Sequence, residues 1–159
     1  MKTNPFVPKR FNYTLTRSIR LPYLLREPDG HDGVTQAPLI LFLHGAGEKG
    51  DDLDKLQKSG HIQAIEQALS FPAWVLCPQC PAGLSGWPIQ DVTVLLDQML
   101  TELPIDPRRV YVTGISMGGR GTYEFAYDYG DRAAAIVPLC AFGIPTLSPR
   151  LRELPVWAF

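Results

Sequence analysis

The stretch Val110-Tyr-Val-Thr-Gly114-Ile-Ser116-Met-Gly118-Gly119 decides the fold of this chain. Its first four residues favour a strand, and the glycines after Ser116 open a segment that is typical of a closely packed helix. A serine between two glycines at such a turn is held in a strained elbow, with its hydroxyl exposed at the edge of a sheet. Gly114 and Gly118 leave room for backbone that a Cβ would obstruct. Ser116 is therefore the candidate nucleophile.

Strands and helices alternate on both sides of this elbow. Continuous apolar runs indicate buried strands, and apolar residues at helical spacing indicate amphipathic helices. Such alternation is typical of parallel βαβ units, so the predicted class is α/β with a mainly parallel, doubly wound sheet. The predicted strands are 38–43, 73–77, 109–113, 133–139 and one that begins at 155–159; the predicted helices are 53–69, interrupted at Ser59-Gly60, 91–103 and 117–129, with Gly130 as its C-cap.

The amino-terminal residues are expected to be arranged differently. Residues 11–19 alternate between apolar and polar side chains, which predicts a strand, and residues 21–26 are its predicted antiparallel partner. Residues 1–10 are predicted to form a flexible segment. No linker or repeat interrupts the rest, so residues 1–159 are predicted to form a single domain.

Composition narrows the function classes. The chain has 159 residues, 45% of them hydrophobic and 19% charged, with a formal net charge of −1. This balance is typical of a globular protein and favours neither nucleic acid nor an anionic membrane as a partner. No apolar stretch is long enough to span a bilayer. The first ten residues lack the apolar core of a signal peptide, which predicts a cytoplasmic location.

The segment Cys77-Pro-Gln-Cys80 matches the Cys-x-x-Cys pattern of redox sites. Prolines flank it, however, and a loop follows it rather than the helix that a thioredoxin-like site requires. A zinc site would need two further ligands at compatible spacing, and the sequence offers no such pair. We therefore interpret both cysteines as structural thiols at the end of a strand.

A second element of chemistry is the loop His44-Gly-Ala-Gly47, which follows the predicted strand 38–43. Acyl transfer passes through a tetrahedral oxyanion that requires two preorganised N–H donors. The N–H of Met117 would supply one, and this loop would supply the other from Ala46.

The same loop also fits the spacing Gly45-x-Gly47-x-x-Gly50, which can cradle a phosphate. Asp51 and Asp52 follow directly and would repel an anion, and no Gly-Lys-Ser/Thr occurs. The sequence therefore favours the oxyanion interpretation.

Several segments together resemble the α/β-hydrolases, most closely carboxylesterases similar to polyhydroxybutyrate-depolymerase and feruloyl-esterase enzymes, near the phospholipase/carboxylesterase group. They are Leu43–Asp52, Pro78–Pro81, Ile105–Gly119 and Pro155–Phe159. The resemblance implies a small ester substrate, an acyl-enzyme on Ser116 and no metal or organic cofactor. It implies Ala46 and Met117 as the oxyanion hole, and His44 as a support of the loop rather than the base. The remaining supports are Gly45, Gly47, Gly114 and Gly118, and Trp87 is a candidate for the substrate pocket.

The family order of the triad is serine, then acid, then histidine, yet no histidine follows Ser116. The chain therefore resembles the amino-terminal part of such an enzyme, with its fold incomplete at the carboxyl end. His31 and His61 are interpreted as surface residues. The acids after the elbow are Glu124, Asp128, Asp131 and Glu153.

Two hypotheses follow from this incomplete triad. The first is a serine hydrolase of carboxylic esters. The second is a non-catalytic truncated or degenerate relative that acts as a fragment or an interaction module. An open sheet edge would favour homo-oligomers in the second case.

Overall fold

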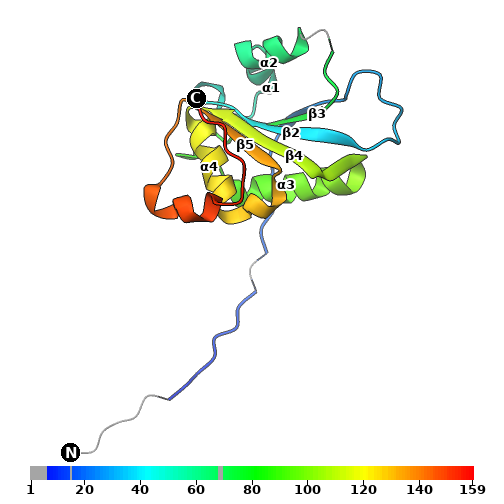
Figure 1. Ribbon diagram of the computed structural model, residues 1–159. Coiled ribbons are helices and arrows are strands. Elements are labelled where there is room, and N and C mark those ends of the chain that lie inside the picture. Colours follow the sequence, from blue (N-terminus) through cyan, green and yellow to red (C-terminus); the bar gives the residue numbers. More distant parts are fainter. Residues whose placement is uncertain (1–6, 15, 68–69) are drawn as a thin grey trace, which may run out of the picture.

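A computed structural model describes residues 7–14, 16–67 and 70–159. Its centre is a five-stranded sheet in the order β1-β3-β2-β4-β5 (Figure 1). β1 pairs antiparallel with β3, and all other pairs are parallel. The strands are β1 (Tyr23–Arg26), β2 (Ala37–Leu43), β3 (Trp74–Pro78), β4 (Ile105–Ile115) and β5 (Ala135–Leu139).

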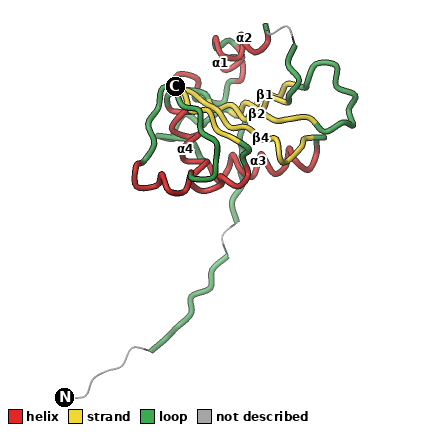
Figure 2. The backbone as a smooth tube through the Cα atoms, in the orientation of Figure 1, coloured by secondary structure: helices red, strands yellow, loops and turns green. Residues whose placement is uncertain are grey.

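Helices cover both faces of the sheet, which confirms the predicted α/β class. Two short helices lie on one face and two longer ones on the other (Figures 1 and 2). The α-helices are α1 (Leu53–Gln57), α2 (Gly60–Glu66), α3 (Ile89–Glu102) and α4 (Met117–Tyr129), and the 3₁₀ turns are η1 (Ala46–Glu48), η2 (Gly130–Arg132) and η3 (Pro145–Leu151). Within the described residues, no helix has the length and apolarity needed to cross a bilayer.

The two faces of the sheet differ in how well they are covered. The face under α3 and α4 carries the main core, in which Val110 and Val112 are fully buried together with Phe125 of α4. The neighbouring β4 residues Tyr111 and Thr113 point to the other face and are only half-buried. The short helices α1 and α2 therefore leave part of their face uncovered in the described chain.

The break predicted at Ser59-Gly60 is confirmed. Ser59 is the N-cap of α2, and its hydroxyl accepts a hydrogen bond from the Ile62 N–H at 3.5 Å. Gly130 follows α4 as its C-cap, as predicted, but it stays right-handed at φ −61° because the chain continues into η2. The predicted helix 53–69 ends earlier than expected, and residues 68 and 69 lie outside the described residues.

The predicted strand at residues 11–19 is wrong. Residues 11–14 and 16–19 form no strand, and residues 7–14 extend away from the sheet (Figure 1). β1 pairs instead with β3, where Leu24 lies opposite Cys77, because the buried β3 offers a more apolar partner. Residues 1–6 of the predicted flexible segment, and Leu15 of the predicted strand, lie outside the described residues.

The strand predicted to begin at residues 155–159 is present only as a single parallel bridge, in which Val156 pairs with Ile136 of β5. The N–H of Trp157 donates to the Ile136 carbonyl at 3.0 Å, and the N–H of Phe159 donates to the Pro138 carbonyl at 3.2 Å. An apolar residue in a predicted strand is expected to lie in the core, but the Trp157 side chain is 69% exposed. It lies in the segment beside β5, at the edge of the described sheet, where no further described element covers it.

Candidate active site

Ser116 forms the turn between β4 and α4. Its backbone is at φ 56° and ψ −114°, a left-handed conformation that non-glycine residues rarely adopt. The Ser116 N–H donates to the Leu139 carbonyl at 2.9 Å, which fixes the turn against β5. The side chain is exposed. Such strain persists only where the surroundings enforce it, and it is common at functional sites.

Close backbone contacts leave no room for a side chain at the glycine positions around Ser116. A Cβ on Gly114 would lie 2.5 Å from the Leu43 carbonyl oxygen, and one on Gly118 would lie 1.8 Å from the same atom. A Cβ on Gly119 would lie 2.5 Å from the Leu139 carbonyl oxygen. Because these obstacles are backbone atoms, they cannot rotate away. The elbow therefore tolerates only glycine at these positions.

The loop after β2 lies directly against the elbow. A Cβ on Gly45 would be 3.9 Å from the Ser116 Cβ. Ala46 is the first residue of η1, and Met117 is the first residue of α4. N–H groups at the start of a helix have no acceptor within that helix, so both can donate to a ligand. A Cβ on Gly47 would meet no atom within 4 Å, so packing does not require glycine at this position.

Ser116, Ala46 and Met117 line one shallow cavity of about 370 Å³. This volume is within the range of small-molecule sites. The other lining residues are Lys49, Ser85, Arg120, Cys140, Ala141 and Phe142.

His44 is buried beneath the loop, and both of its ring nitrogens are occupied. Nε2 accepts the Cys80 N–H at 3.0 Å, so the proton must be on Nδ1, which donates to the Gly45 carbonyl at 2.6 Å. Burial lowers the pKa of His44, although this hydrogen bond and the nearby Glu48 oppose the shift. A neutral histidine with no free nitrogen supports the loop and has no lone pair for Ser116.

Trp87 supports the same loop from below. Its side chain is buried, and its Nε1–H donates to the His44 carbonyl at 3.2 Å. A Cβ on Gly121 would lie 2.7 Å from the indole Cδ1, so α4 packs directly on the ring. The sequence proposed Trp87 for the substrate pocket, whereas the indole lies between the loop and α4, outside the residues that line the Ser116 cavity.

The comparisons with known proteins agree with this geometry. No family model matches the chain. The bifunctional acetylxylan esterase/xylanase XynS20E of Neocallimastix patriciarum is 32% identical over 127 residues, which cover 76% of this chain and 18% of that protein. The crystal structure of a thermostable esterase matches at 30% identity with a TM-score of 0.74, over 89% of this chain and 42% of the esterase. The chain is an α/β-hydrolase of esterase lineage.

A more distant solved structure shows the fold alone. The acetyl xylan esterase from Aspergillus awamori is 17% identical with a TM-score of 0.57, and the match covers 79% of this chain and 50% of that enzyme. The α/β-hydrolase described here thus spans less than half of the thermostable esterase and less than a fifth of the curated relative.

Sequence reasoning missed the segment that holds the loop after β2 in place. The buried Gln79 donates from Nε2 to the carbonyls of Glu48 at 2.9 Å and Asp52 at 2.8 Å. The Cys80 carbonyl accepts the Gly50 N–H at 2.9 Å. A glutamine between buried cysteines was the available signal, because a buried amide needs partners.

Neither of the other two histidines is among the described residues that line the Ser116 cavity. His31 bonds within its own turn and packs on Trp74, at the amino end of β3, whereas Ser116 lies at the carboxyl end of β4. The His61 ring packs on Phe42, 5.8 Å between centroids.

The predicted acids are also remote from the elbow or engaged elsewhere. Glu124 accepts from Arg120, and Asp128 pairs with Arg150. Asp131 and Glu153 line a separate cavity at the far end of α4. Among the described residues, the cavity at the elbow therefore contains the candidate nucleophile Ser116 and the candidate donors Ala46 and Met117, but none of these histidines or predicted acids.

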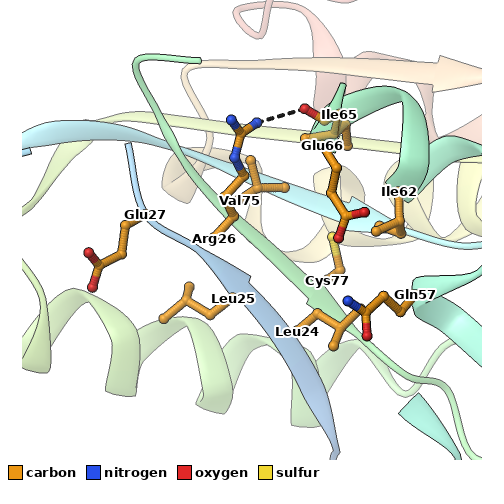
Figure 3. A pocket seen from close by; sticks show the side chains of 10 residues that line it. All are labelled: Leu24, Leu25, Arg26, Glu27, Gln57, Ile62, Ile65, Glu66, Val75 and Cys77. Carbon is orange, nitrogen blue, oxygen red and sulfur yellow. Dashed lines mark hydrogen bonds between the residues drawn. The ribbon is translucent and has the colours of Figure 1, made fainter. Parts of the chain in front are cut away.

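A second cavity, of about 440 Å³, lies between β1, β3 and α2 (Figure 3). Arg26 closes one side through a hydrogen bond to the Ile65 carbonyl at 2.7 Å (Figure 3). Burial raises the pKa of the Cys77 thiol on its floor to about 12, and burial also raises the pKa of Cys80. Both thiols are therefore protonated near neutral pH, which supports the structural interpretation of the Cys-x-x-Cys segment.

Proposed function

We propose that this chain carries the nucleophile and the oxyanion hole of a carboxylic ester hydrolase. The observation that carries the proposal is the strained, exposed Ser116 in one cavity with two helix-starting residues, Ala46 and Met117. The esterase relatives support it, since they match 76% and 89% of this chain.

In the proposed reaction, the Ser116 oxygen attacks the carbonyl carbon of a small ester. The carbonyl oxygen becomes an oxyanion that accepts hydrogen bonds from the N–H groups of Ala46 and Met117. The C–O bond to the alcohol then breaks, which leaves an acyl group on Ser116, and water releases the acid in a second step. These proposed reaction steps require no cofactor.

A general base must take the Ser116 proton and return it to the leaving alcohol. Within the described chain, His44 is occupied by two hydrogen bonds, and His31 and His61 lie elsewhere. We propose that the acid and base come from residues other than those described here. Loss of the base alone lowers turnover by about six orders of magnitude in comparable triads, so this chain by itself would turn over very slowly.

A fluorophosphonate probe tests the proposal, because it reacts with an activated serine without requiring turnover. We expect labelling that is slow, because no general base is present among the described residues, but that maps to Ser116 and disappears in Ser116→Ala. Thr113→Ser is the matched control, since it keeps a hydroxyl on the same strand outside the cavity. Equal labelling of the wild-type chain and Ser116→Ala would contradict the proposed function.

A second candidate function is supported by the open sheet edge. Trp157 is 69% and Phe159 64% exposed along residues 155–159. An unpaired edge with exposed aromatics can pair with another chain, so a degenerate relative could act as an interaction module or form homo-oligomers. Sedimentation that shows a monomer with full esterase turnover would exclude it. The cytoplasmic location and the lack of a nucleic-acid partner stay predictions of the sequence.

A further inference from the structure

The Ser116 cavity is lined by two cations from different parts of the chain. Lys49 follows η1 in the oxyanion loop, and Arg120 lies one turn into α4. No aspartate or glutamate is among the described residues that line this cavity. The start of α4, with Met117, adds the positive end of its helix dipole to the same space.

Neither cation is fully neutralised by a neighbouring carboxylate. Lys49 donates from Nζ to the Leu84 carbonyl at 2.8 Å, and none of the ion pairs in the described chain involves it. Arg120 donates from Nε to Glu124 at 2.8 Å. A guanidinium has further donors on its two terminal nitrogens, so Arg120 can bind a second anion while it keeps Glu124.

Apolar residues line the same cavity. Ala141 and Phe142 follow β5, and Phe142 is 82% exposed. A ligand that reaches Ser116 thus meets hydrocarbon as well as two cations. Its hydrocarbon part would pack on Phe142, and a charged group of the ligand would bind Lys49 and Arg120.

We infer that the site selects esters whose acyl or alcohol part carries a carboxylate, which Lys49 and Arg120 bind beside Ser116. The inference rests on the proposed function, since it concerns the substrate of that same serine. Partly exposed ion pairs of this kind each change affinity by about fivefold at most. Two such pairs therefore predict roughly a tenfold preference for an anionic ligand over a neutral one of the same shape, and this preference should fall as salt is added.

Two arylboronic acids test the inference without requiring a general base for turnover. Boron accepts the Ser116 oxygen to form a tetrahedral adduct, and the hydroxyl proton leaves to solvent. The charged probe is 3-carboxyphenylboronic acid, and its neutral counterpart is 3-carbamoylphenylboronic acid. We expect calorimetric affinity to be roughly tenfold higher for the charged probe, with most of this ratio lost in Lys49→Gln/Arg120→Gln and about threefold lost in each single variant.

Charge-conserving variants separate ligand binding from loop support. Lys49→Arg and Arg120→Lys should retain the affinity ratio between the charged and the neutral probe. Lys58→Gln, which removes an exposed cation outside the cavity, should leave this ratio unchanged. Equal affinity for both probes, with both signals lost in Ser116→Ala, would overturn the inference and keep the proposed function. Binding that is insensitive to Ser116→Ala would overturn both.

Discussion

β5 lies between a tightly packed region, the elbow at Ser116, and a loosely packed one, the exposed edge formed by residues 155–159. On one side, its Leu139 carbonyl accepts the Ser116 N–H, in an elbow where no additional Cβ fits. On the other side, the N–H of Cys140 donates to the Phe159 carbonyl, along an edge whose aromatic side chains are exposed. Ser116 is thus held by contacts among β2, β4, β5, α4 and their loops, and none of these contacts comes from residues 155–159. Changes at the elbow should therefore be costly, and changes at the edge should cost little within one chain.

Gly118→Ala is the strongest way to test this contrast. The new Cβ would lie 1.8 Å from the Leu43 carbonyl oxygen, so the elbow or β2 would have to move. We expect a loss of about 3 kcal/mol or more in the free energy of unfolding, measured by urea denaturation. Gly47→Ala, in the neighbouring loop after β2 and with open space around the new Cβ, is the matched control and should stay near wild type. Equal stability of both variants would show that the elbow is less tightly packed than described.

His44→Leu removes the two hydrogen bonds of the buried imidazole and replaces the ring with an apolar side chain of similar size. The Cys80 N–H and the Gly45 carbonyl would be left without these partners. We expect a cost of about 2–3 kcal/mol in the free energy of unfolding, together with weaker fluorophosphonate labelling of Ser116 because the loop loosens. His61→Gln is the control on the less covered face. Unchanged labelling in His44→Leu would mean that the loop keeps its shape without the imidazole.

The same residue predicts a pH dependence. Burial lowers the folded-state pKa of His44 below its ordinary value of 6.5, so below that pH the unfolded chain binds a proton that the folded chain does not. Stability is then lost as the pH falls from about 6.5 towards the lowered pKa, with a slope of at most about 1.4 kcal/mol per pH unit. Denaturation of wild type and His44→Leu between pH 8 and pH 5 should show the slope reduced in the variant. Identical slopes would show that His44 is protonated equally in both states.

The sequence predicts the elbow well because its constraints are local. A predicted strand followed by a serine between glycines at fixed spacing suffices to indicate the turn. In the structure, Ser116 has the positive φ of such a turn, and Gly114 and Gly118 make the close backbone contacts expected of them. The role of Gln79 could not be predicted, because it depends on two carbonyls about thirty residues away in the chain. Trp157 was misplaced for a related reason: an apolar strand residue is buried only if another element covers it.

Trp87→Phe tests the single hydrogen bond by which the Trp87 indole supports the loop after β2. It removes the hydrogen bond to the His44 carbonyl but keeps an aromatic ring against Gly121. We expect a loss of about 1 kcal/mol in the free energy of unfolding. Trp74→Phe is a matched control, because the buried Trp74 Nε1–H has no hydrogen-bond partner among the described residues. A cost for Trp87→Phe no greater than that for Trp74→Phe would show that the indole N–H contributes nothing to the loop.

Trp157→Ser should have the smallest effect on the chain itself. Its side chain is 69% exposed and its ring packs on Phe159, 4.9 Å between ring centroids, so the free energy of unfolding should change by less than about 0.5 kcal/mol. The effect should be on association, because the exposed aromatics are the apolar surface of an edge that can pair with a second chain. Sedimentation over a concentration series should show self-association of the wild-type chain that weakens in Trp157→Ser and persists in Val34→Ser, an exposed apolar residue in the loop before β2. A wild-type chain that stays monomeric at every concentration would show that exposed aromatics alone do not make this edge an interface, and the contrast with the elbow would then be one of packing only.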